Sequence, residues 1–162
     1  MKTLISLLLF AVFWSLAPEL SKVRTDYREA SNSEEMTKKL HDNLISVSKN
    51  DETVLVAYKG AITTMMSKYA EGIKDKKTFF KDGRELLEFA VETVPESVEI
   101  RCIRLSVQEN APKIVGYKKN IVEDKQFILD NYASMTDTGA KEFVKGYSLQ
   151  SDAFSDAEKQ LF

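Results

Sequence analysis

Apolar residues recur every three or four positions along most of the chain, which is the spacing of a helix face. The densest stretch runs from Glu85 to Tyr132 and holds two of the three prolines and the only cysteine. It predicts a helical hairpin broken at Pro95, then a third helix, with the other helices packed on them. We therefore expect an all-α fold, a compact array or bundle of about six to seven short antiparallel helices.

Three helices are expected before this stretch. The first covers residues 19–30, and Ser31 with Glu34 has the capping-box spacing that opens a second. Residues 50–52 are expected to cap a third helix, which ends by Gly72.

A lysine-rich segment, residues 73–81, separates the third helix from the next. We interpret it as a connector whose aromatic residues, Phe79 and Phe80, point into the core. Asp82 and Glu85 repeat the capping-box spacing, so they predict that a new helix begins there.

The centre of the dense stretch is rich in β-branched side chains, and a strand is an alternative there. Val98, Ile100 and Cys102 alternate as they would in a strand. Ile103 breaks that alternation, and Ile100, Ile103 and Val107 fit one helix face. We therefore expect a central helix, with Cys102 as a buried and unreactive thiol.

The chain after this helix predicts two further helices. Residues 114–119 are expected to be irregular around Gly116, followed by helices over 120–132 and 140–147. Residues 148–162 are polar and predict a loose C-terminal tail.

The N-terminal run Leu4–Ala17 is apolar, uncharged and preceded by Lys2. A helix that spans a bilayer needs about 20 residues, so this run of about 14 is typical of a signal peptide over residues 1–17. Pro18 disfavours cleavage there, so the signal is either cut elsewhere or kept as an uncleaved anchor, and a buried N-terminal helix is a further alternative. We expect residues 18–147 to form a single helical domain that is exported, either periplasmic or secreted.

The charge balance bears on partners. The chain has a formal net charge of −2, and without residues 1–17, which contribute only Lys2, it is −3. Nucleic-acid and anionic-membrane binders need a basic surface, so the balance argues against both but leaves a local patch open. The lysines between Lys74 and Lys81 are the candidate for such a patch, and a solvated connector is the alternative.

Two resemblances add to this interpretation. Gly83, Leu87, Ala90 and Pro95 are spaced like the second half of a tetratricopeptide repeat, which implies helix-turn-helix packing. The first half of that pattern is not present.

The second resemblance rests on the run over residues 99–112, followed by Gly116–Ile121 and Asp124. This run resembles a set of small exported helical proteins of Bacteroidota, over about residues 40–130. The resemblance implies a fold and a compartment. Some of these proteins carry an adenylosuccinate-lyase name, but this chain lacks the glycine-rich serine loop of such lyases, so no activity is implied.

No catalytic residue, cofactor or metal site is predicted. His41 is the sole histidine and lies beside Asp42 on a helix surface, whereas a zinc site needs several histidine or cysteine ligands. Asp137-Thr138-Gly139 does not match the calcium loop.

The best candidate site is a set of polar residues that we call the polar seam. Three of them lie at i, i+3 and i+7 of the central helix, and three follow the break at Pro112. An arginine paired with Asp124 would hold the intervening loop in place, whereas an unfilled guanidinium would bind an anion or a carboxylate terminus. The six residues are Arg101, Arg104, Gln108, Tyr117, Asn120 and Asp124.

The sequence therefore predicts an exported, non-catalytic binding or scaffolding module with a protein partner in the cell envelope. Nucleic acid is not expected as a partner, and membrane contact is expected only through an uncleaved N-terminal segment. The alternative is a small-ligand or anion binder, or an enzyme, that uses the polar seam. A concave pocket around Arg101 would favour the alternative, and a fully paired seam would favour the scaffold.

Overall fold

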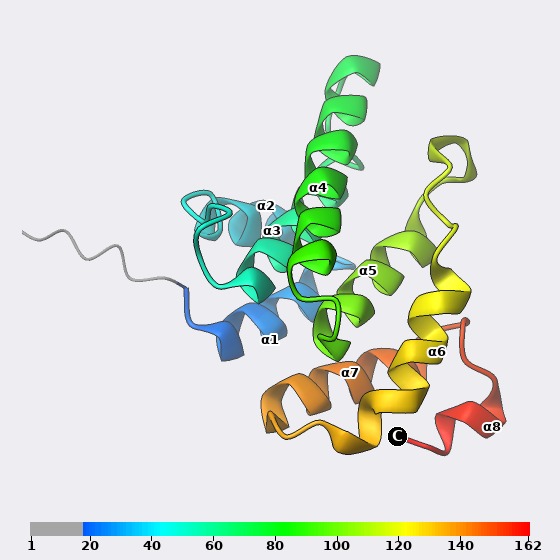
Figure 1. The fold of residues 1–162 in the computed structure, drawn as a ribbon. Coiled ribbons are helices and arrows are strands. Elements are labelled where there is room, and N and C mark those ends of the chain that lie inside the picture. The colour runs from blue at the N-terminus through cyan, green and yellow to red at the C-terminus, as the bar shows by residue number, and fades with distance from the viewer. Residues whose placement is uncertain (1–17) are drawn as a thin grey trace, which may run out of the picture.

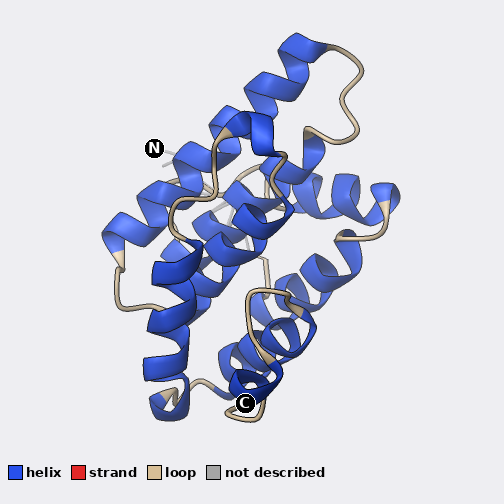
Figure 2. Ribbon diagram, turned by 90° about the vertical axis from the view of Figure 1, so that its right-hand side faces the viewer, coloured by secondary structure: helices blue, strands red, loops and turns tan. Residues whose placement is uncertain are grey.

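The computed structural model describes residues 18–162, so the predicted signal peptide or anchor at 1–17 lies outside the described residues. The described part contains eight α-helices and no strand, which confirms the all-α prediction (Figures 1 and 2). None of these helices is long and apolar enough to cross a bilayer. In chain order the elements are α1 (Leu20–Ala30), α2 (Glu34–Asn43), α3 (Thr53–Met66), α4 (Ile73–Thr93), α5 (Val98–Asn110), a 3₁₀ turn at Lys113–Val115, α6 (Ile121–Asn131), a 3₁₀ turn at Tyr132–Ser134, α7 (Thr138–Gln150) and α8 (Asp156–Lys159).

Helix α5 lies at the centre of the fold, as predicted. It packs against α3, α4, α6 and α7 (Figure 1). Ten of its thirteen residues are buried. The Ser97 hydroxyl accepts a hydrogen bond from the backbone N–H of Ile100 at 3.3 Å, so Ser97 caps the start of the helix. A strand is not formed here, because the buried residues surround the segment as they do in a core helix.

Helix α3 is also largely buried. Nine of its fourteen residues are buried, including Leu55, Val56 and Ile62. A helix that is apolar on all sides has no polar face to mark its orientation in the sequence. The packing of α2, α4 and α5 around α3 makes it a second central helix.

Helices α3 and α4 approach each other most closely at two glycines. A Cβ on Gly83 would lie 2.5 Å from both the Gly60 carbonyl oxygen and the Thr64 nitrogen. A Cβ on Gly60 would lie 2.7 Å from the Gly83 carbonyl oxygen. Because these neighbours are backbone atoms, they cannot rotate away, and only glycine permits this helix contact.

Replacement of Gly83 by alanine is expected to destabilise the protein by about 1–3 kcal/mol, because the added methyl group overpacks the α3–α4 contact. The intrinsic preference of alanine for helices, about 1 kcal/mol over glycine, acts in the opposite direction. Gly146→Ala is the matched control, since Gly146 also lies inside a helix and its Cβ would meet only the Arg28 Nη1 at 3.6 Å. Chemical denaturation should show Gly146→Ala stabilised and Gly83→Ala destabilised. Equal stability of the two variants would contradict the close contact.

The prediction of a connector at residues 73–81 is wrong. These residues form the first turns of α4, which runs unbroken to Thr93, so Asp82 and Glu85 lie inside a helix and cap nothing. The buried face of Phe80, Gly83, Leu87 and Ala90 keeps helical spacing through the supposed start. Lysines are good helix formers, so their density indicates exposure and not a break.

Two of the predicted caps also differ from the structure. Helix α2 is capped by Ser33, whose hydroxyl accepts from the backbone N–H of Met36 at 3.2 Å, and Ser31 is not the cap. Helix α3 has Glu52 at its N-cap position but no side-chain cap, and the carboxylate of Asp51 accepts hydrogen bonds from the backbone and side chain of Ser48.

The C-terminal residues 148–162 do not form the predicted loose tail. Helix α7 continues to Gln150, and α8 follows. The Phe162 ring packs edge-to-face on Tyr132 at 4.8 Å and on Phe154 at 5.3 Å, and Phe154 is 3 % exposed. The few aromatic residues of a polar segment therefore anchor it to the core, and the helical domain extends to residue 162.

Candidate functional site

The residues of the polar seam come from three consecutive segments. Helix α5 supplies Arg101, Arg104 and Gln108, and it ends before Pro112, which cannot continue the helix hydrogen bonds. Gly116, with φ of 63°, adopts the left-handed conformation that favours glycine and turns the chain back toward α5. Helix α6 then packs on α5 and delivers Asp124 to the arginines.

Arg104 and Asp124 form a bidentate pair. The Arg104 Nε donates to Asp124 Oδ2 at 2.7 Å and its Nη2 donates to Oδ1 at 2.6 Å. Arg104 is 4 % exposed and Asp124 is fully buried. Burial by itself would lower the pKa of Arg104, but the hydrogen bonds and charge of Asp124 outweigh it and raise that pKa, so the guanidinium stays charged.

Arg101 shares the same carboxylate. Its Nη1 donates to Asp124 Oδ1 at 3.0 Å and to Glu123 Oε1 at 2.6 Å. Its guanidinium carbon also lies 4.9 Å from the centre of the Phe127 ring. Hydrogen bonds from Asn120 and Arg101 lower the pKa of Glu123, which keeps this carboxylate ionised.

Helix α4 completes the seam through Glu88, which the sequence analysis missed. Glu88 Oε2 accepts from Arg104 Nη1 at 3.1 Å, and its Oε1 accepts a hydrogen bond from the Tyr117 hydroxyl. Burial and the hydrogen bond with Glu88 raise the pKa of Tyr117, so its phenol remains a donor. No spacing rule connects Glu88 with residues that lie sixteen or more positions away, so only the fold could reveal it.

Gln108 and Asn120 contribute less than the other members of the polar seam. The Gln108 amide nitrogen lies 3.5 Å from Asn120 Oδ1, at the limit of a hydrogen bond, and Gln108 Oε1 is buried without a partner. Asn120 instead donates to Glu123 Oε2 at 2.7 Å.

The polar seam is therefore internally paired, with two guanidiniums facing three carboxylates, those of Glu88, Glu123 and Asp124. An incoming anion would compete with a fully buried carboxylate that already occupies the Arg104 fork. The geometry favours the interpretation in which the seam joins α4, α5, α6 and the loop between the last two.

A second buried ion pair joins α1 to α5. The Arg24 Nε and Nη2 donate to the two oxygens of Glu99 at 2.7 and 2.8 Å, and the Tyr58 hydroxyl donates to Glu99 Oε1 at 2.8 Å. Asp137, the N-cap of α7, accepts from Arg24 at 3.1 Å. The hydrogen bond with Glu99 raises the pKa of Arg24, so this pair too remains charged. It was not predicted, because Arg24 and Glu99 are far apart in the sequence.

The two residues singled out as possible reactive groups are both packed. Cys102 is fully buried, and burial raises the pKa of its thiol well above the ordinary value, in agreement with the predicted unreactive thiol. The His41 ring packs edge-to-face on Phe79 at 6.0 Å between ring centres.

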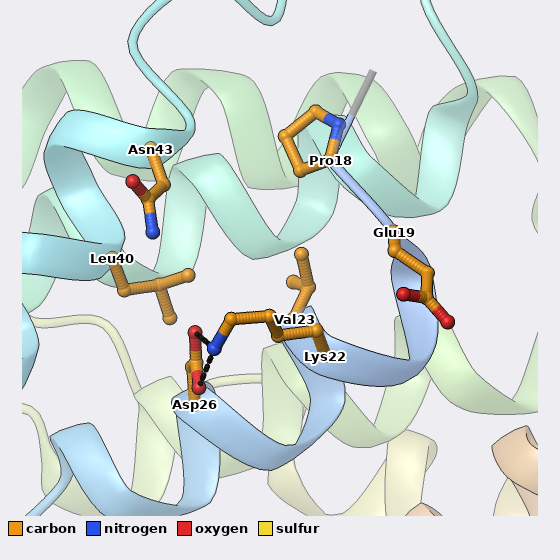
Figure 3. Close-up of a pocket in the computed structure, with 7 residues that line it drawn as sticks. All are labelled: Pro18, Glu19, Lys22, Val23, Asp26, Leu40 and Asn43. Atoms are coloured by element: carbon orange, nitrogen blue, oxygen red, sulfur yellow. Dashed lines mark hydrogen bonds and ion pairs between the residues drawn. The ribbon is translucent and has the colours of Figure 1, made fainter. Parts of the chain in front are cut away.

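Two shallow pockets lie away from the polar seam. The first, about 260 Å³, lies between α1 and α2 near Pro18, and Figure 3 shows the Lys22–Asp26 ion pair, 2.8 Å long, beside the apolar side chains of Val23 and Leu40. The second, about 350 Å³, lies where α5 and α7 begin and includes Glu99 and Asp137, which already bind Arg24. Neither pocket includes Arg101.

The most distinctive surface is formed by two projecting segments, residues 73–78 and 112–119, which we call the basic end. In Figure 1 they are the upper turns of α4 and the loop before α6, both in the upper part of the molecule. The rings of Phe80, two residues after the first segment, and of Tyr117, in the second, lie 5.9 Å apart, edge to face, and join α4 to the loop before α6. All of residues 73–78 are exposed.

The charges of the described residues are strongly segregated. The basic end contains one acid, Asp75, and six lysines, for a net charge of +5, whereas the described chain as a whole, with 22 basic and 25 acidic residues, is at −3. The remainder therefore carries −8. The lysines are Lys74, Lys76, Lys77, Lys113, Lys118 and Lys119.

In comparisons with known proteins, no family model, no curated protein and no solved structure matches this chain.

Proposed function

We propose that this protein is an exported, non-catalytic binding or scaffolding module whose contact surface is the basic end. The observation that carries the proposal is the segregation of charge, +5 on two projecting segments against −8 on the rest of the described chain. A potential of this kind attracts and orients an anionic partner toward one end of a molecule. The apolar run Leu4–Ala17 supports the exported location.

The internal ion pairs support a scaffolding role. The polar seam ties the loop that carries half of the basic end to α4 through the hydrogen bond between Tyr117 and Glu88. It also ties α6 to α5 through Asp124. The hydrogen-bonded ion pairs of the seam stabilise the relative positions of the elements they join, which supports a constant shape for the basic end.

The alternative, a small-ligand or anion binder or an enzyme that uses the polar seam, has less support. The Arg104 fork is filled by Asp124, and Arg101 is engaged by two carboxylates and the Phe127 ring. An anion at the seam would have to displace a carboxylate that has no access to solvent.

Photo-crosslinking in cells tests the proposal. A photoreactive amino acid at Ile114, which is 94 % exposed in the basic end, is expected to capture an envelope component. The matched control position is Ile45, which is 62 % exposed but lies in the turn after α2. The adduct at Ile114 should disappear when Lys76 and Lys77 are replaced by glutamate, whereas equal labelling at both positions, or labelling insensitive to these lysines, would contradict the proposal.

A further inference from the structure

We infer that the basic end binds the surface of a bilayer that contains anionic phospholipid, with its lysines at the headgroup phosphates and Ile114 inserted between them. The inference rests on the proposed function, because it names the partner that the contact surface binds. It also differs from membrane attachment through the N-terminal run, since all the residues it uses lie in the folded domain.

The tip of the loop carries an exposed apolar residue with lysines before and after it in the sequence. Ile114 lies in the 3₁₀ turn Lys113–Val115 and is 94 % exposed, the highest value among the exposed large apolar side chains of the described residues. Lys113 precedes it, and Lys118 and Lys119 follow, all exposed. An exposed apolar side chain flanked by lysines is the pattern of a segment that inserts at the boundary between headgroups and acyl chains.

The first turns of α4 repeat this chemistry. Ile73 is 76 % exposed and is followed by Lys74, Lys76 and Lys77. Among the described residues, these three lysines form no ion pair, in contrast to Lys22 and Lys125, which are bound to carboxylates. Free ammonium groups on long aliphatic stems can place the stem against apolar surface and the charge at a phosphate.

The shape and composition of the basic end favour a bilayer over other anionic partners. The two segments project, and the two pockets described above lie elsewhere in the molecule. The aromatic residue of the basic end, Tyr117, is buried and packs on the Phe80 ring of α4, so it cannot stack on nucleic-acid bases. The charge of −8 on the remainder would be repelled by an anionic surface, which orients the molecule with the basic end toward the lipid.

Vesicle co-sedimentation tests the inference. The full chain is mixed with vesicles of phosphatidylcholine alone or of phosphatidylcholine with phosphatidylglycerol. The gain, defined as the increase in bound protein when the anionic lipid is added, measures binding by the basic end separately from binding by the N-terminal run. We expect this gain to fall as salt is raised, because screening weakens attraction to the surface. Lys76→Gln and Lys119→Gln should each lower the affinity for anionic vesicles about fivefold. Ile114→Asp should lower it roughly tenfold or more, because the apolar side chain is lost from the bilayer boundary.

Matched controls are Lys39→Gln and Ile45→Asp, which change exposed residues outside the basic end and should leave binding unchanged. Circular dichroism of each variant verifies the fold, which these exposed positions should not affect. Equal binding to both vesicle types, or parental binding by Ile114→Asp, would overturn the inference.

Retention on a heparin column tests the alternative that the partner of the basic end is a soluble polyanion and not a bilayer. Heparin retention that is the same for the parent and for Ile114→Asp, without a gain on anionic vesicles, would assign the basic end to such a polyanion and overturn the bilayer. If the protein does not bind anionic vesicles but still crosslinks from Ile114 to an envelope protein, only this inference is rejected and the proposed function stands. Loss of the vesicle gain, the heparin retention and the crosslinks together would reject the proposed function as well.

Discussion

Replacement of Asp124 by alanine is expected to lower the free energy of unfolding by about 3–5 kcal/mol, because it leaves two guanidiniums in the protein interior without the carboxylate that both bind. Arg104 is 4 % exposed, and its only remaining acidic partner within hydrogen-bond distance would be Glu88. Urea denaturation of parent and variant measures the loss. Asp130→Ala is the control on the same helix, since Asp130 is exposed and bonded only to Gln126, and it should change stability by less than about 0.5 kcal/mol.

A double-mutant cycle separates a structural seam from a binding one. When Arg104→Met is combined with Asp124→Leu, part of the loss should be recovered, since a buried pair replaced by apolar side chains leaves no unpaired charge. The same cycle with Arg101 should give a smaller coupling, because Arg101 also binds Glu123, the Pro95 carbonyl and the Phe127 ring. Near-parental stability of Asp124→Ala, together with thermal stabilisation by an added anion, would instead support the ligand-binding alternative.

Replacement of Ile103 by alanine is expected to cost about 2–5 kcal/mol, because it removes a fully buried side chain from the helix on which four others pack. The loss of stability has two contributions, the transfer free energy of the removed methylene and methyl groups and the cost of the cavity that they leave. The cavity persists in part, because α3 and α4 are fixed by their glycine contact and can move only partly into the space. Urea denaturation again gives the value.

Ile114→Ala is the matched control for Ile103→Ala. The same side chain is removed, but at a position that is 94 % exposed, so its unfolding free energy should change by less than about 0.5 kcal/mol. A loss below about 1 kcal/mol for Ile103→Ala would show that α5 is not the packed centre of the fold.

The polar seam shows how a candidate site can be predicted in part. The spacing of Arg101 and Arg104 placed them on one face, and the break at Pro112 delivered Asp124 to them, as the structure confirms. Glu88 could not be predicted, because its place in the seam depends on how α4 crosses α5. The Arg24–Glu99 pair was missed for the same reason, since α1 and α5 meet only in the folded chain.

Local sequence determined the helices, because helix periodicity, the Ser97 cap and the breaks at Pro95 and Pro112 act over a few residues. It also placed α5 at the centre, since apolar side chains surround that helix on most sides. Tertiary structure alone decided that the first turns of α4 project from the fold (Figure 1) and that residues 148–162 pack through Phe154 and Phe162. It also decided which carboxylate meets which arginine, and it gathered six lysines at one end of an acidic chain. These features depend on distances between residues far apart in sequence, which the packing of whole helices sets and no local spacing encodes.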